Sequence, residues 1–116
     1  MKLMSENVSD LLSEKVIEFN SRIDNEPSFS KMIEGKNRTI CICVSDGDTY
    51  SSKLENLRIE DFVKTDDNSA DLTVTANSET LVALIEREMS PVKAYMKGDL
   101  KVKASLTDML LLKKLF

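Results

Sequence analysis

Two cysteines have the spacing in this chain that most readily suggests chemistry. Cys41 and Cys43 lie two positions apart in the run Thr39-Ile40-Cys41-Ile42-Cys43-Val44, so on a strand they would point to the same face. A closed zinc site needs four ligands, the chain contains no histidine, and a disulfide between such close neighbours would be strained. Because free cysteines are usually buried as small apolar residues, we interpret this pair as part of the interior.

The other polar residues form no recognisable catalytic or metal-binding motif. The absence of histidine excludes Ser-His-Asp and Cys-His catalysis. Asp46 and Asp48 have the opening spacing of an EF-hand loop, but Ser51 occupies the position that requires glycine and Leu57 the position that requires glutamate. The three glycines are far apart, so there is no phosphate-binding loop. We therefore expect no catalytic residues, no metal and no cofactor.

The composition is ordinary for a soluble globular protein, with 41% hydrophobic and 31% charged residues in a chain of 116. No run of about 18 apolar residues is present, so no segment is expected to span a membrane. The acidic residues Glu6, Asp10, Glu14 and Glu18 are incompatible with the apolar core of a secretory signal. We expect a single domain over residues 1–116, located in the cytoplasm.

Charge is unevenly distributed along the chain. Its net value of −4 argues against nucleic acid as a partner. Residues 89–116 contain six lysines and two aspartates, a local charge of +4, so the first 88 residues carry −8. Lys93 and Lys97 are one helical turn apart, and Lys101 and Lys103 share one strand face. A solvated surface explains this pattern, and the alternative is weak docking on an anionic membrane surface.

Hydrophobic periodicity predicts the elements that must position these groups. We expect helices over residues 5–24, 27–34, 78–88 and 91–97, and from residue 106 onward. We expect strands over residues 37–44, 50–54, 57–60, 70–77 and 100–104. Residues 64–69 are expected to form a polar loop, in or beside which Asp66, Asp67 and Asp71 would be turn residues.

Helix-boundary signals are clearest in the C-terminal part. Ser90 has the character of an N-cap, Pro91 suits the first helical position, and Gly98 suits a left-handed helix stop. Ser105 and Asp108 have the spacing of a capping box. The alternation of apolar and polar residues in the last two strands leaves one sheet face polar. These features predict an α+β fold with two layers: a five-stranded mixed sheet with its helices packed on one face.

The final segment is more apolar than a surface helix requires. Seven of the last eleven residues are hydrophobic, whereas a surface helix needs an apolar stripe on one side only. Such a helix must be buried by its own domain, by a partner, or against an apolar ligand.

Residues 70–116 resemble the sterol carrier protein 2 (SCP-2) family of lipid-transfer domains. The matching segments are Ala70-Asp71-Leu72-Thr73-Val74-Thr75, Leu81-Val82-Ala83-Leu84, Met89-Ser90-Pro91, Ala94-Tyr95-Met96-Lys97-Gly98, Leu100-Lys101-Val102-Lys103 and Lys113-Lys114-Leu115. No single segment is diagnostic, but their combination in this order is specific. The first 69 residues match mainly in the order of their elements.

The resemblance implies a non-catalytic module that binds or transfers lipid. Fatty acyl chains, acyl-CoA or sterols would occupy an apolar tunnel between the sheet and the helices. Each buried methylene contributes about 0.8 kcal/mol, so an apolar cavity is sufficient for such binding. The chain departs from the family at Ala104, where glycine is common. It also ends in Lys114-Leu115-Phe116, which is not a peroxisomal targeting tripeptide; this argues against a peroxisomal placement and is compatible with a stand-alone, non-organellar member.

We predict that the lipid site is built from apolar residues of the C-terminal third. The expected lining is Leu81, Leu84, Ile85, Met89, Val92, Met96, Leu106, Met109 and Leu110. The expected lid or mouth is Leu112, Leu115 and Phe116. For each of these residues, ordinary core packing is the alternative.

A second function class remains open. The apolar C-terminal helix could seal a homodimer or dock on a lipid-handling enzyme, with the cavity closed by side chains. Bound ligand and oligomeric state separate this accessory-subunit reading from the lipid carrier.

Overall fold

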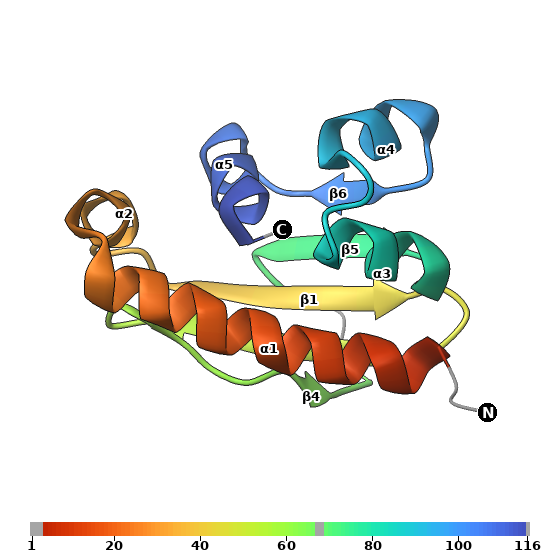
Figure 1. Ribbon diagram of the computed structural model, residues 1–116, viewed down its shortest axis with the longest axis horizontal. Helices are drawn as coiled ribbons and strands as arrows, with labels where there is room; N and C mark the ends of the chain where they lie inside the picture. Colours follow the sequence, from red (N-terminus) through yellow and green to blue (C-terminus); the bar gives the residue numbers. More distant parts are fainter. Residues whose placement is uncertain (1–3, 67–68, 116) are drawn as a thin grey trace.

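A six-stranded mixed sheet forms one layer of the computed structural model, which describes residues 4–66 and 69–115 (Figure 1). The strands are β1 (Arg38–Val44), β2 (Thr49–Glu55), β3 (Arg58–Ile59), β4 (Val63–Lys64), β5 (Leu72–Ala76) and β6 (Lys101–Lys103). Their order is β3-β2-β1-β5-β6, and β4 also pairs with β2. Parallel pairing of β1 with β5 and antiparallel pairing elsewhere make the sheet mixed, as predicted.

Five helices form the second layer. They are α1 (Met4–Asn25), α2 (Pro27–Ile33), α3 (Ser78–Ile85), α4 (Pro91–Lys97) and α5 (Leu106–Leu115). The long helix α1 runs across β1 and packs against α2 and α3, whereas α4 and α5 lie beside β6 (Figure 1). None of the described helices is both long and apolar enough to cross a bilayer.

Alternation along the strands decides which face the helices cover. Ile42 of β1 lies between Tyr50 of β2 and Val74 of β5, and Val74 lies beside Val102 of β6. Ile42, Tyr50 and Val74 are buried under the helices, while the next position of β1, Cys43, faces the other side. The predicted α+β fold, with helices on one face of a mixed sheet, is confirmed.

The core lies between the two layers. The α1 residues that repeat at helical spacing are buried in it: Val8, Leu12, Val16, Phe19 and Ile23. The rings of Phe19 and Phe29 meet edge to face at 5.0 Å, which fixes α2 against α1. Ala94 of α4 and Leu111 of α5 belong to the same cluster, so both C-terminal helices are attached to the core.

Helix boundaries at the C-terminal end follow the predicted caps. The Ser90 hydroxyl accepts the Lys93 N–H at the start of α4, and Gly98 ends α4 with a φ of 85°. The Ser105 hydroxyl accepts the Asp108 N–H in the first turn of α5. These contacts set the ends of the two helices that flank the candidate site.

Three local predictions were wrong. Val63 and Lys64 form the sixth strand, β4, because they pair with Ser51 and Tyr50. Leu57 lies in a turn with a φ of 60°, so β3 begins one residue later than expected. Helix α3 ends at Ile85 instead of near residue 88, because Arg87 adopts a φ of 62° and the next amide bonds back to Ala83.

Candidate functional site

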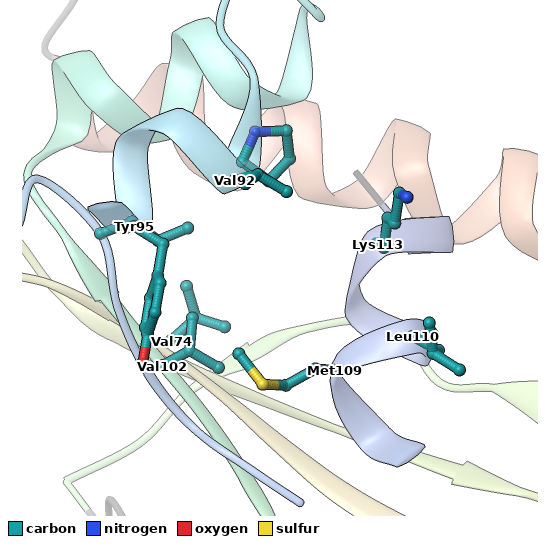
Figure 2. A pocket seen from close by; sticks show the side chains of 9 residues that line it. Val74, Val92, Tyr95, Val102, Met109, Leu110 and Lys113 are labelled. Carbon is teal, nitrogen blue, oxygen red and sulfur yellow. The ribbon is translucent and has the colours of Figure 1, made fainter. Parts of the chain in front are cut away.

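An apolar cleft opens between the sheet and the two C-terminal helices (Figure 2). Its floor consists of Val74 of β5, Val102 of β6, and Leu100, which directly precedes β6. One wall comes from α4 and the other from α5. The wall residues are Pro91, Val92 and Tyr95 on α4 and Met109, Leu110 and Lys113 on α5. The cleft encloses about 270 Å³ and is open to solvent on one side.

Strand pairing and helix packing explain why the cleft is open. Antiparallel pairing places Val102 directly beside Val74, so two short apolar side chains form the floor. Leu111 is buried in the core and attaches α5 to it, and the buried Ala94 attaches α4 in the same way. Helix α4 lies over β6 and α5 follows beyond its end (Figure 1), and the cleft is lined by residues of both helices and of the sheet between them.

An ion pair holds α5 in place at the edge of the cleft. The Arg38 Nε donates to both carboxylate oxygens of Asp108 at 3.0 Å. Asp108 is buried, and this contact joins α5 to the start of the central strand β1. A buried carboxylate without a partner would destabilise the fold, so the ion pair favours the observed position of the first turn of α5.

The electrostatics of the cleft are simple. Among the described residues that line it, Lys113 is the only one that carries a charge. The Tyr95 ring forms part of the opposite wall (Figure 2). Such a lining can hold an apolar chain.

The two helices that form the walls present apolar side chains to solvent. Val92 is 55% exposed and Met96 80% exposed on α4, and Leu110 is 59% and Leu106 85% exposed on α5. Large apolar side chains gathered at one place on a surface usually mark an interaction site. Here Val92 and Leu110 belong to the lining of an apolar cleft, and Met96 and Leu106 lie on the same two helices.

The structure places the twelve predicted lipid-site residues in four different environments. Val92, Met109 and Leu110 line the cleft together. Met89 is half-buried and lines a second, more open pocket at the start of α4, together with Leu84. Met96 on α4 and Leu106 on α5 are exposed and do not line the cleft.

The other predicted residues do not meet at the cleft. Leu81, Leu84 and Ile85 of α3 are buried in the core under α1. The side chains of Leu112 and Leu115, and all of Phe116, lie outside the part of the chain that the structure describes.

Six lining residues were not predicted as part of the site: Val74, Pro91, Tyr95, Leu100, Val102 and Lys113. The alternation that predicts β5 and β6 already assigns Val74 and Val102 to the covered face, so their signal was present. Nothing in the helical periodicity of α5 separates Lys113 from the neighbouring lysine, because the rotation of the helix about its axis is set by packing.

The other groups with chemical potential have structural roles. The Cys41 and Cys43 sulfurs lie 3.6 Å apart on the uncovered sheet face, with Cys41 buried. The Ser78 amide and hydroxyl both donate to Asp46 and lower the pKa of that carboxyl. Thr39 does the same for Asp71, again lowering its pKa. Within residues 4–66 and 69–115, no group of three potential His, Cys, Asp or Glu ligands could hold a metal ion.

The four lysines that were considered together lie on two surfaces. Lys93 and Lys97 are exposed on α4, beside the cleft. Lys101 and Lys103 flank Val102 on β6, pair with Thr75 and Thr73, and therefore project from the opposite face of the sheet.

Comparison with known proteins places these features in context. Residues 18–116 match the profile of the SCP-2 sterol transfer family. A comparison with curated protein sequences finds no significant match.

Solved structures share the fold at low sequence identity. A crystal structure of sterol carrier protein 2 is 16% identical, with a TM-score of 0.65 and coverage of 98% of this chain and 94% of that one. Sterol Carrier Protein-2 from Aedes aegypti, in complex with a C16 fatty acid (palmitate), has the same identity and coverage and a TM-score of 0.66. The sec-alkylsulfatase Pisa1 from Pseudomonas sp. is 18% identical with a TM-score of 0.61, and the match covers 75% of this chain but only 14% of the sulfatase.

Proposed function

Because this chain belongs to the SCP-2 sterol transfer family, we propose that it binds one acyl lipid in the cleft between β5, β6, α4 and α5. The family is one of lipid-binding and lipid-transfer domains, and one structural relative holds a C16 fatty acid. The observation that carries the proposal is the open apolar cleft with a single charged residue in its described lining. We assign no catalytic step to this site.

The size of the cleft favours a flexible chain over a rigid ring system. Its 270 Å³ corresponds to roughly nine water volumes of about 30 Å³ each, and a methylene is of similar size. About nine methylenes at about 0.8 kcal/mol each would contribute on the order of 7 kcal/mol before the entropy cost of binding. A flexible chain can adapt to the lining and extend through the open side of the cleft, so we place fatty acyl ligands ahead of sterols.

Docking on a membrane surface would bring the cleft to its ligand. The two wall helices carry Val92, Met96 and Leu106 as exposed apolar side chains, and Lys93 and Lys97 are exposed on the same helix as the first two. Apolar and basic side chains together are suited to the interface of an anionic bilayer. We therefore include weak membrane docking through α4 in the proposed function.

Exposed apolar residues at the entrance also support the alternative of an interaction subunit. In that reading, Met96, Leu106 and Leu110 would be buried against a second copy of the chain, and the cleft would be closed by the contact. The lipid-carrier hypothesis predicts a monomer with a bound lipid, whereas the interaction-subunit hypothesis predicts a dimer without one.

Filling the floor of the cleft tests the proposed function. Val102→Phe places a phenyl ring where we propose that the chain lies and displaces about two to four methylenes. At about 0.8 kcal/mol each, this should weaken fatty acid binding at least tenfold. Displacement of a fluorescent fatty acid by dodecanoate measures the change.

Val63→Phe provides the matched control, because Val63 is exposed on β4, outside the cleft lining. This variant should bind like the wild-type protein. Equal affinity of the Val102→Phe variant and the wild-type protein, with both folded by circular dichroism, would show that the ligand lies elsewhere.

A further inference from the structure

Lys113 stands at the mouth of an otherwise apolar cleft. It extends from α5, while Val74 and Val102 lie at the floor (Figure 2). No described carboxylate pairs with Lys113, whereas the nearest acidic residue on the same helix, Asp108, is occupied by Arg38. The site therefore combines a deep apolar end with a cation that is available at its entrance.

The surrounding charges reinforce this polarity. Among the described residues, the lining contains no acidic side chain. Lys93 and Lys97 on the opposite wall helix are exposed outside the cleft, and Lys101 and Lys103 project from the other sheet face. An anionic group at the entrance would thus meet positive potential from Lys113 and from α4, while the attached chain is buried below it.

We propose that Lys113 is a specificity-determining residue that selects a single-chain lipid with an anionic head group over a neutral lipid of equal length. The head group lies at the entrance against the Lys113 ammonium, and the chain runs over Val102 toward Val74. This inference rests on the proposed function, because it assigns an orientation and a head-group class to a ligand in the same cleft. A carboxylate and a phosphate share the required chemistry.

The solvent exposure of Lys113 determines how strong its preference for an anionic head group can be. Lys113 is exposed to solvent, and exposed ion pairs are weak and screened by salt. We therefore expect a modest preference of about three- to fivefold for the anionic ligand, and we expect high salt to remove most of it.

Three ligands of one chain length test the inference by displacement of a fluorescent fatty acid. They are dodecanoate, dodecyl phosphate and dodecan-1-ol, compared on the wild-type protein and on the Lys113→Met variant. Methionine keeps an unbranched apolar stem on the wall and removes the charge. We expect the variant to lose the preference for an anionic ligand while its affinity for dodecan-1-ol stays within twofold of wild type, which also shows that the cleft is intact.

Lys103→Met is the matched control, because it removes the same charge and Lys103 projects from the sheet face opposite the cleft. It should keep the preference. Preference for dodecanoate alone or for dodecyl phosphate alone identifies the head group that Lys113 recognises.

Two results would overturn the inference. One is equal binding of all three ligands by the wild-type protein, and the other is an unchanged preference in the Lys113→Met variant; either would leave chain binding in the cleft intact. If none of the ligands displaces the probe from the wild-type protein, the proposed function itself fails.

Discussion

Arg87 ends α3 in the left-handed region, with a φ of 62°. The Arg87 amide donates to the Leu84 carbonyl and the Glu88 amide to the Ala83 carbonyl, which is the hydrogen-bond pattern of a Schellman motif. Glycine usually occupies this position, because any other residue pays about 1–2 kcal/mol for the conformation. The Arg87 guanidinium gains only an exposed ion pair with Glu18 at 2.6 Å.

We predict that the Arg87→Gly variant is more stable than the Arg87→Ala variant by about 1 kcal/mol. Both substitutions remove the ion pair with Glu18, so the comparison isolates the backbone conformation. Urea unfolding followed by circular dichroism measures the difference. Equal stability of the two variants would mean that Arg87 leaves the left-handed conformation in solution.

Single side chains also mark the limit of what the sequence predicts about the site. Val92, Met109 and Leu110 were predicted and line the cleft, whereas Leu81, Leu84 and Ile85 lie in the core. Both groups have the same apolar periodicity. Only the three-dimensional packing of α3 under α1 assigns the second group to the interior, so sequence pattern alone cannot separate lining from core.

At the scale of elements, most of the fold could be predicted. The apolar spacing of α1, the alternation of β1 and β5, and the caps Ser90, Gly98 and Ser105 are local signals, and each gave the right element. Strand β4 was missed because two residues have no periodicity, and they become a strand only through pairing with β2.

The cleft itself arises from the placement of α4 and α5. Their existence follows from local sequence, but the gap between them depends on Ala94 and Leu111 reaching the core, and on Arg38 pairing with Asp108 across 70 positions of sequence. Contacts of such long range leave no local pattern. This is why Lys113 became visible as a site residue only in the folded chain, whereas strand alternation had already assigned Val102 to the covered face.

At the scale of the whole molecule, charge is segregated. The chain carries −4 overall, yet residues 89–116, which build both walls of the cleft, carry +4. Lys93, Lys97 and Lys113 contribute to this charge at the end of the molecule that carries the cleft, whereas Lys101 and Lys103 project from the other sheet face, so we expect an anionic membrane to attract the cleft end. That end would present the cleft entrance to the bilayer.

We predict that neutralising Lys93 and Lys97 with glutamine weakens binding to anionic vesicles by about 30-fold, since each lysine near such a surface contributes about 1 kcal/mol. Co-sedimentation with phosphatidylserine-containing vesicles measures this change. The matched control replaces Lys101 and Lys103, which lie on the opposite sheet face. If the control pair weakens binding as much as the α4 pair, the effect is one of net charge and α4 is not the docking surface.

The central claim is that one acyl lipid occupies the cleft of a monomer. Native mass spectrometry of protein purified without detergent tests it most directly, followed by extraction and identification of any molecule released on denaturation. The account predicts a monomer that carries one single-chain lipid of a few hundred daltons. A ligand-free dimer that also fails to take up a fluorescent fatty acid would contradict it and would favour the interaction subunit.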